Sequence, residues 1–168
     1  MNGLQEMIFI SEIALQSKIA QRAAECLKAN ENSFDKIEVW SSIQSILVAA
    51  ANVSKILWSS NKKYEKRGER LRQILRVEKE NILSDRKFRN HFEHYDDRIE
   101  EWFCNNSNGV YIDLAMNPSF PGRTLNNNHR GYNSFDNTLV FRDQSLDLNE
   151  VLKALEDILN NCKPHTLT

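Results

Sequence analysis

The stretch FDKIEVWSSIQSILVAAANVSKILWS, residues 34–59, contains neither glycine nor proline. Its apolar and small side chains recur every three or four residues on one stripe: Trp40, Ile43, Leu47, Ala50, Ser54 and Leu57. Side chains at this spacing share one face of an α-helix. The alanine triplet 49–51 indicates that a neighbouring helix approaches closely. The stretch therefore predicts a long helix inside a helical bundle.

The segments on both sides of this stretch also show helical spacing. Residues 5–29 lack glycine and proline and carry Met7, Ile10, Ala14 and, further on, Leu27 at helical spacings, so they predict a first long helix. Residues 59–69 break the pattern, with Gly68 as a helix breaker, and a short basic helix is expected at about 69–77. A fourth helix is expected from Ser84 or Asp85, either of which can cap it, to about Phe103.

The chain changes its period after this fourth helix. Apolar and polar residues alternate over 110–116, which predicts a half-buried strand, and TLVFRD at 138–143 is a second candidate strand. Asp147 and Glu150 resemble a capping box that opens a last helix. The expected fold is mainly α: a single domain over 1–168, built as a four- to five-helix bundle with a small β-hairpin at about 110–143 before the last helix.

Composition narrows the class of protein. Forty per cent hydrophobic and 27% charged residues are typical of a folded globular chain, neither disordered nor fibrous. The first residues carry no pattern of a secretory signal, and the longest strictly apolar run, residues 46–51, is far too short to cross a bilayer. Cys26, Cys104 and Cys162 are odd in number and widely spaced, which favours reduced thiols. We expect a cytoplasmic protein with no membrane partner.

The net charge of −1 hides a basic block between Lys62 and Arg89. That block holds eleven basic and five acidic residues, so it carries +6 and the rest of the chain carries −7. A local basic block on a mildly acidic protein attracts phosphates while the remainder repels them. The alternative is an ordinary solvated helix and loop.

The segment RNHFEHYDDRIEEW, residues 89–102, concentrates ionisable side chains next to this block. On an ideal helix its apolar stripe is expected to face the core: Phe88, Phe92, Tyr95, Ile99, Trp102 and Phe103. His91 and Arg98 lie on the shoulder of the stripe, so half-burial is expected for both. Arg89, Asn90 and His94 face outward. Histidine exchanges protons near neutral pH, and arginine clamps a phosphate through two nitrogens.

A metal site is the alternative use of this segment. His91 and His94 are three residues apart, and Asp97 or Glu101 could complete the ligand set. The nearby arginines would repel a cation. We therefore expect no metal site and no cofactor.

The sequence R-N-x-x-x-H, here Arg89 to His94, resembles the RX4–6H signature of the HEPN superfamily, in which a polar residue such as Asn90 follows the arginine. Arg86 to His91 is a second register of the same signature, but the helical wheel directs His91 toward the core. The resemblance covers the helical frame, roughly 1–104 and 146–162, and the longer string 89–102 looks like a recurring bacterial subgroup. The strand pair at 110–143 departs from the minimal HEPN pattern.

The resemblance implies a metal-independent endoribonuclease that leaves a 2′,3′-cyclic phosphate, either a toxin with an antitoxin partner protein or a phage-defence effector. In it, His94 acts as general base or acid, Arg89 neutralises the phosphoryl oxygens, and Asn90 orients either His94 or the phosphate. Basic side chains would hold the flanking RNA backbone: Lys62, Lys63, Lys66, Arg67, Arg70 and Arg86.

Arg89 and His94 are about 140° apart on a regular helix, so one chain does not focus both on one phosphorus. Two facing copies do, and the sequence therefore predicts a homodimer with these residues near the twofold axis. The alternative function is a non-catalytic HEPN-like module that binds nucleic acid or a partner protein. Five acidic residues within 93–101 favour that alternative.

Overall fold

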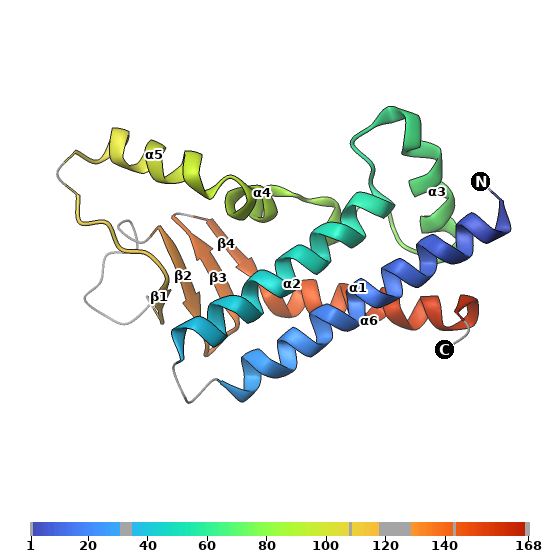
Figure 1. Ribbon diagram of the computed structural model, residues 1–168, viewed down its shortest axis with the longest axis horizontal. Coiled ribbons are helices and arrows are strands. Elements are labelled where there is room, and N and C mark those ends of the chain that lie inside the picture. The colour runs from blue at the N-terminus through green and yellow to red at the C-terminus, as the bar shows by residue number, and fades with distance from the viewer. Residues whose placement is uncertain (1, 31–34, 108, 118–128, 143, 167–168) are drawn as a thin grey trace.

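The computed structural model describes residues 2–30, 35–107, 109–117, 129–142 and 144–166, with the backbone alone described at Phe88 and Arg89 (Figure 1). Two long antiparallel helices, α1 (Gly3–Ala29) and α2 (Lys36–Leu57), form its centre, and α6 (Leu148–Cys162) packs along them. Asn2 caps α1 in a reciprocal bond pattern with Gln5, and Asp35 caps α2 through the N–H groups of residues 37 and 38. These helices confirm the long helices that the sequence predicts.

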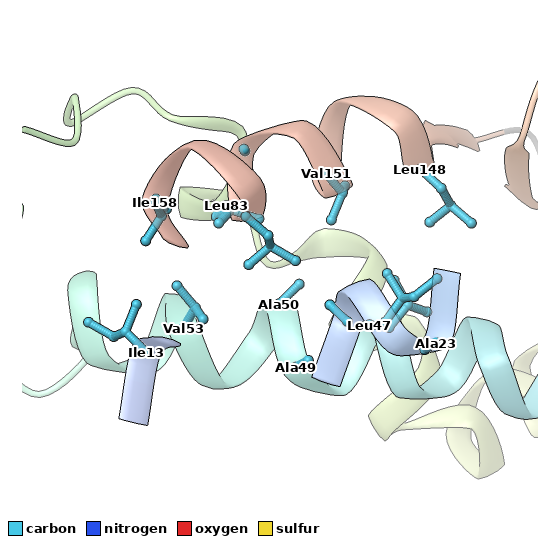
Figure 2. Packing of buried hydrophobic residues seen from close by; sticks show 14 of the residues in the cluster. Ile13, Ala23, Leu47, Ala49, Ala50, Val53, Leu83, Leu148, Val151 and Ile158 are labelled. Carbon is cyan, nitrogen blue, oxygen red and sulfur yellow. The ribbon is translucent and has the colours of Figure 1, made fainter. Parts of the chain in front are cut away.

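The core lies between α1, α2, α6 and the short 3-10 helix η2 (Ile82–Ser84). Figure 2 shows Ile13, Ala49 and Val53 on one side of this core and Leu83, Val151 and Ile158 on the other. All six residues of the stripe predicted for residues 34–59 are buried. Burial of such a continuous apolar face is the main source of stability for helices of this kind.

The residues that mark α1 in the sequence lie on different sides of the helix. Ile10, Ala14 and Leu27 are buried, whereas Met7 is 44% exposed. It lies about 100° around the helix from the centre of the buried face, at 100° per residue. Opposite the core, α1 presents an outer stripe of exposed apolar side chains: Leu4, Met7, Ile8, Leu15 and Ile19.

The short basic helix starts earlier than the sequence predicts. A 3-10 helix, η1 (Lys62–Tyr64), leads into α3 (Glu65–Ile74), so Gly68 lies inside the helix and does not break it. A Cβ atom at Gly68 would overlap the carbonyl oxygen of Leu57 at the end of α2. The same carbonyl accepts a hydrogen bond from the Arg72 guanidinium. Glycine is therefore required here because α3 lies directly against the end of α2.

The predicted helix from Ser84 or Asp85 to Phe103 is two helices, α4 (Lys87–Glu93) and α5 (Tyr95–Asn105). They meet at His94, which has φ −112° and ψ 42° and is not helical. The bend makes a single helical wheel invalid for the segment. Trp102 is buried, but Tyr95 and Phe103, both expected in the core, are 51% and 54% exposed.

The predicted β-hairpin is a four-stranded sheet in the order β1–β2–β3–β4. The strands are β1 (Ala115–Met116), β2 (Arg130–Asn133), β3 (Thr138–Phe141) and β4 (Gln144–Asp147). β1 pairs in parallel with β2, and the other neighbours are antiparallel. The pairing of 110–116 with 138–143 is wrong because β2 lies between them. Asp147 ends β4 and caps α6 through the N–H of Asn149, as the sequence predicts for the start of that helix.

No helix in the described ranges combines the length and the apolar character needed to cross a bilayer.

Candidate functional site

His94 occupies the break between α4 and α5. Its side chain is 59% exposed, and the carboxylate of Asp97 lies 4.0 Å from its Nδ1. The backbone N–H of His94 donates to the carbonyl of Asn90 at 3.0 Å, so Asn90 lies one turn before it. Arg89 lies in the middle of α4, and its side chain falls outside the described part of the chain.

The break gives His94 the surroundings of a proton-transfer group. Its imidazole reaches solvent, and the carboxylate of Asp97 lies beside it. A solvent-exposed imidazole can take a proton from a hydroxyl and return it to a leaving group.

His91 lies in different surroundings, against the sheet. Its ring stacks on Phe141 at 4.1 Å between centroids, and its Nε2 is 3.1 Å from Oε1 of Gln144. Burial lowers the pKa of His91, the hydrogen bond to Gln144 opposes this, and the charge of Arg98 adds to the lowering. The half-burial predicted from the helical wheel is confirmed. The second register of the signature therefore ends on a histidine that faces the sheet.

The two histidines do not converge as a metal pair, because His91 hydrogen-bonds to Gln144 of the sheet while His94 projects to solvent. Within the described residues, no three side chains of His, Cys, Asp or Glu gather in an arrangement suited to a metal ion.

The six predicted RNA-binding residues fall into three groups. Lys62, Lys63 and Lys66 are exposed on η1 and α3. Two arginines hold α3 in place instead: Arg67 donates to the carbonyl of Lys55 at 3.1 Å, and Arg70 pairs with Glu6 at 2.9 Å. The sixth, Arg86, lines a cavity at the start of α4.

Lys55 is a basic residue that the sequence analysis missed. Its Nζ lies 3.5 Å from Oε1 of Glu93 in α4, while its carbonyl accepts from Arg67 in α3. The end of α2 therefore joins the basic helix to the helix that carries Asn90. Nothing in the local pattern marks Lys55, because it belongs to a helix otherwise recognised by its buried stripe.

A second group of polar residues, between α5 and the sheet, was also missed. Arg130 and Asp113 form a half-buried ion pair at 2.6 Å, and Arg142 donates to the carbonyl of Arg98. His129 beside them is fully buried, and neither ring nitrogen has a hydrogen-bond partner among the described residues. Its ring packs against Tyr111 and Phe141 at 5.5 and 4.9 Å. Burial lowers the pKa of His129 to about 4, so this imidazole is neutral at pH 7.

Comparisons with protein-family models, with curated proteins and with solved structures find no match for this chain. The described geometry defines a mainly helical protein with a small four-stranded sheet and an exposed histidine–carboxylate pair at a helix break.

Proposed function

We propose that this chain is a HEPN-type, metal-independent endoribonuclease that cleaves RNA to a 2′,3′-cyclic phosphate and a 5′-hydroxyl. The observation that carries the proposal is the exposed imidazole of His94, with Asp97 at 4.0 Å and Asn90 one turn before it. Asn90 and His94 are the second and the last residue of the R-N-x-x-x-H motif, and the fold leaves the histidine open to a large substrate.

The reaction needs one proton acceptor and one site of positive charge. His94 removes the proton of a ribose 2′-hydroxyl, and the 2′ oxygen bonds to the adjacent phosphorus. The bond from phosphorus to the 5′ oxygen then breaks, and that oxygen leaves with a proton from an imidazolium. Arg89 neutralises the charge on the phosphoryl oxygens, while exposed Lys62, Lys63 and Lys66 bind the RNA backbone.

We propose that the active form is a homodimer in which each scissile phosphate lies between Arg89 of one copy and His94 of the other. The support is α5, which lies over the sheet away from α1 and α6 (Figure 1) and exposes Tyr95 and Phe103. Exposed aromatic side chains of this kind are typical of a protein interface. A contact through α5 brings both copies of His94 close to the twofold axis.

The dimer contact is tested by placing charge on α5. We expect Tyr95→Glu and Phe103→Glu to convert the dimer into a monomer at micromolar concentration, because a buried carboxylate without a partner strongly disfavours association. Light scattering measures the mass. Ile8→Glu is the matched control, since Ile8 is a comparably exposed apolar residue on the outer stripe of α1. Dissociation by Ile8→Glu alone would assign the dimer to α1 and contradict the composite site.

The activity is tested by incubating the purified chain with mixed RNA, with and without EDTA. We expect cleavage that persists in EDTA, with cyclic phosphate at the new 3′ ends. We expect Asn90→Ala to reduce the rate by about tenfold or more, since positioning of a reacting group contributes strongly to rate. Cleavage that disappears in EDTA would contradict the proposal.

A non-catalytic RNA-binding module is the second candidate function. Glu93, Asp96, Asp97 and Glu100 are all exposed around the histidine and make this surface less attractive to a phosphate. This function is indicated if the chain retains RNA in a gel-shift assay without cutting it and Lys62→Ala or Lys63→Ala weakens retention. In either function, a toxin role would require a neutralising partner protein.

A further inference from the structure

Arg142 joins the sheet to the first half of α5. It follows the last residue of β3, and its Nη2 donates to the backbone carbonyl of Arg98 at 2.6 Å. Its Nη1 donates to Oε2 of Glu101 at 3.4 Å, while Oε1 of Glu101 accepts from Arg98 at 2.6 Å. The guanidinium also lies 5.3 Å from the ring centroid of Phe141. A planar guanidinium can hold two acceptors of one helical turn at the same time.

The backbone of Arg142 adopts a conformation that an arginine rarely takes. Its φ is 54°, in the left-handed region that favours glycine and asparagine. Phe141 pairs with Gln144, so two residues, 142 and 143, join β3 to β4. Hairpin loops of this length favour glycine or asparagine for the same steric reason. Local backbone preference therefore does not account for an arginine at this position, whereas the contacts with α5 give its side chain a role.

The turn that Arg142 holds begins at the candidate site. The backbone N–H of Arg98 donates to the carbonyl of His94 at 3.2 Å. Asp97, whose carboxylate lies 4.0 Å from Nδ1 of His94, directly precedes Arg98. The side chain of His94 does not cap α5. The start of this helix therefore depends on tertiary contacts for its position.

The far end of α5 has a separate anchor. Trp102 is buried, and its ring packs on Tyr111 at 5.0 Å between centroids. A buried aromatic side chain of this size makes a strong apolar contact. Loss of the Arg142 contact would therefore loosen the first half of α5 without detaching the whole helix.

We infer that Arg142 is a positioning residue for the candidate site, which holds the first half of α5 on the sheet and thereby fixes Asp97 beside His94. The inference rests on the proposed function, because it takes His94 and Asp97 as parts of a reacting site. Arg142 acts through the backbone of Arg98 and through Glu101, not through the RNA. Small displacements of positioned groups reduce reaction rates strongly.

Hydrogen exchange of the full chain tests the contact without RNA. We expect Arg142→Gly to speed exchange of the backbone amides of residues 98–102 by about tenfold or more, because two hydrogen bonds of a charged group are lost. The amides of α1 should exchange as in wild type.

Arg76→Gly is the matched control. Arg76 also has a positive φ, 51°, but it lies just beyond the end of α3. Glycine relieves the same backbone conformation in both variants, and only Arg142→Gly removes a contact with α5. Exchange of residues 98–102 at the wild-type rate in Arg142→Gly would overturn the inference. Equally fast exchange of these residues in Arg76→Gly would also overturn it.

Cleavage kinetics test the positioning role. We expect Arg142→Gly to lower kcat by about tenfold and to change KM by less than about twofold, because the lysines of η1 and α3 that bind RNA in the proposed function are unchanged. Arg142→Lys keeps the charge but replaces the forked guanidinium with a single ammonium, so it should recover part of kcat. A loss confined to KM would assign Arg142 to RNA binding and contradict the positioning role.

The two proposals fail separately. Faster exchange in α5 of Arg142→Gly, together with no RNA cleavage by wild type, would support the attachment of α5 and remove the nuclease. RNA cleavage with an unchanged kcat in Arg142→Gly would remove the positioning role and leave the nuclease.

Discussion

A mixed dimer of one Arg89→Ala chain and one His94→Ala chain is expected to cleave RNA at about half the wild-type rate, although each variant alone loses about 100-fold or more. In the proposed dimer each site combines Arg89 of one copy with His94 of the other. One of the two sites in the mixed dimer therefore keeps both wild-type residues. Two affinity tags, one on each chain, isolate the mixed dimer, and single-turnover cleavage measures its rate.

The reciprocal control is a mixed dimer of wild type with the double variant Arg89→Ala/His94→Ala. Sites built across the twofold axis make this dimer inactive, because each site then lacks one residue. Sites built within one chain give the reverse pattern, with half activity in the control and none in the first mixture. That reverse pattern would contradict the composite site, and it would not depend on the identity of the RNA.

Acid is expected to destabilise the fold through His129. Its pKa in the folded chain is about 4, compared with an ordinary value of 6.5. The unfolded chain therefore binds more protons between these two values, so the stability is complete above pH 6.5 and falls as the pH drops toward 4. At about 1.36 kcal/mol per pKa unit, the free energy of unfolding decreases by about 3 kcal/mol over this window.

His129→Leu isolates this effect, because leucine packs beside Tyr111 and Phe141 without gaining a proton. Urea unfolding at pH 7 and at pH 4 should show a loss smaller by about 3 kcal/mol in the variant than in wild type. His94→Ala is the control, and since His94 is exposed it should follow wild type. Equal losses in His129→Leu and wild type would show that His129 carries no part of the acid sensitivity.

Short-range periodicity was sufficient to predict the three long helices α1, α2 and α6. The spacing of Trp40, Ile43 and Leu47 identified the buried face of α2, and Asp147 identified the start of α6. The same reasoning placed His91 on the shoulder of its helix and directed attention to Asn90 and His94. These predictions succeed because residues three or four apart in a helix share a face whatever the rest of the chain does.

The break at His94 was not predictable from its neighbours. Residues 89–102 contain no glycine or proline, and backbone hydrogen bonds continue through the break, from His94 to Asn90 and from Arg98 to His94. The two helices pack against different partners: Phe92 lies on Trp40 of α2, while Trp102 lies on Tyr111. The bend therefore depends on contacts with two distant segments.

By itself, the sequence determined the long helices, the buried face of α2, the start of α6 and the motif that resembles a known superfamily, all of which depend on residues close together in the chain. Only the tertiary structure decided the order of the four strands, the burial of His129 and the cavity that joins Ser54, Arg86 and Gln144. Ser54, Arg86 and Gln144 come from segments far apart in the chain. No local sequence pattern indicates which of these segments pack together. The exposure of His94 depends on both levels. Its position in the motif is a local feature of the sequence, whereas its place at a bend depends on tertiary contacts.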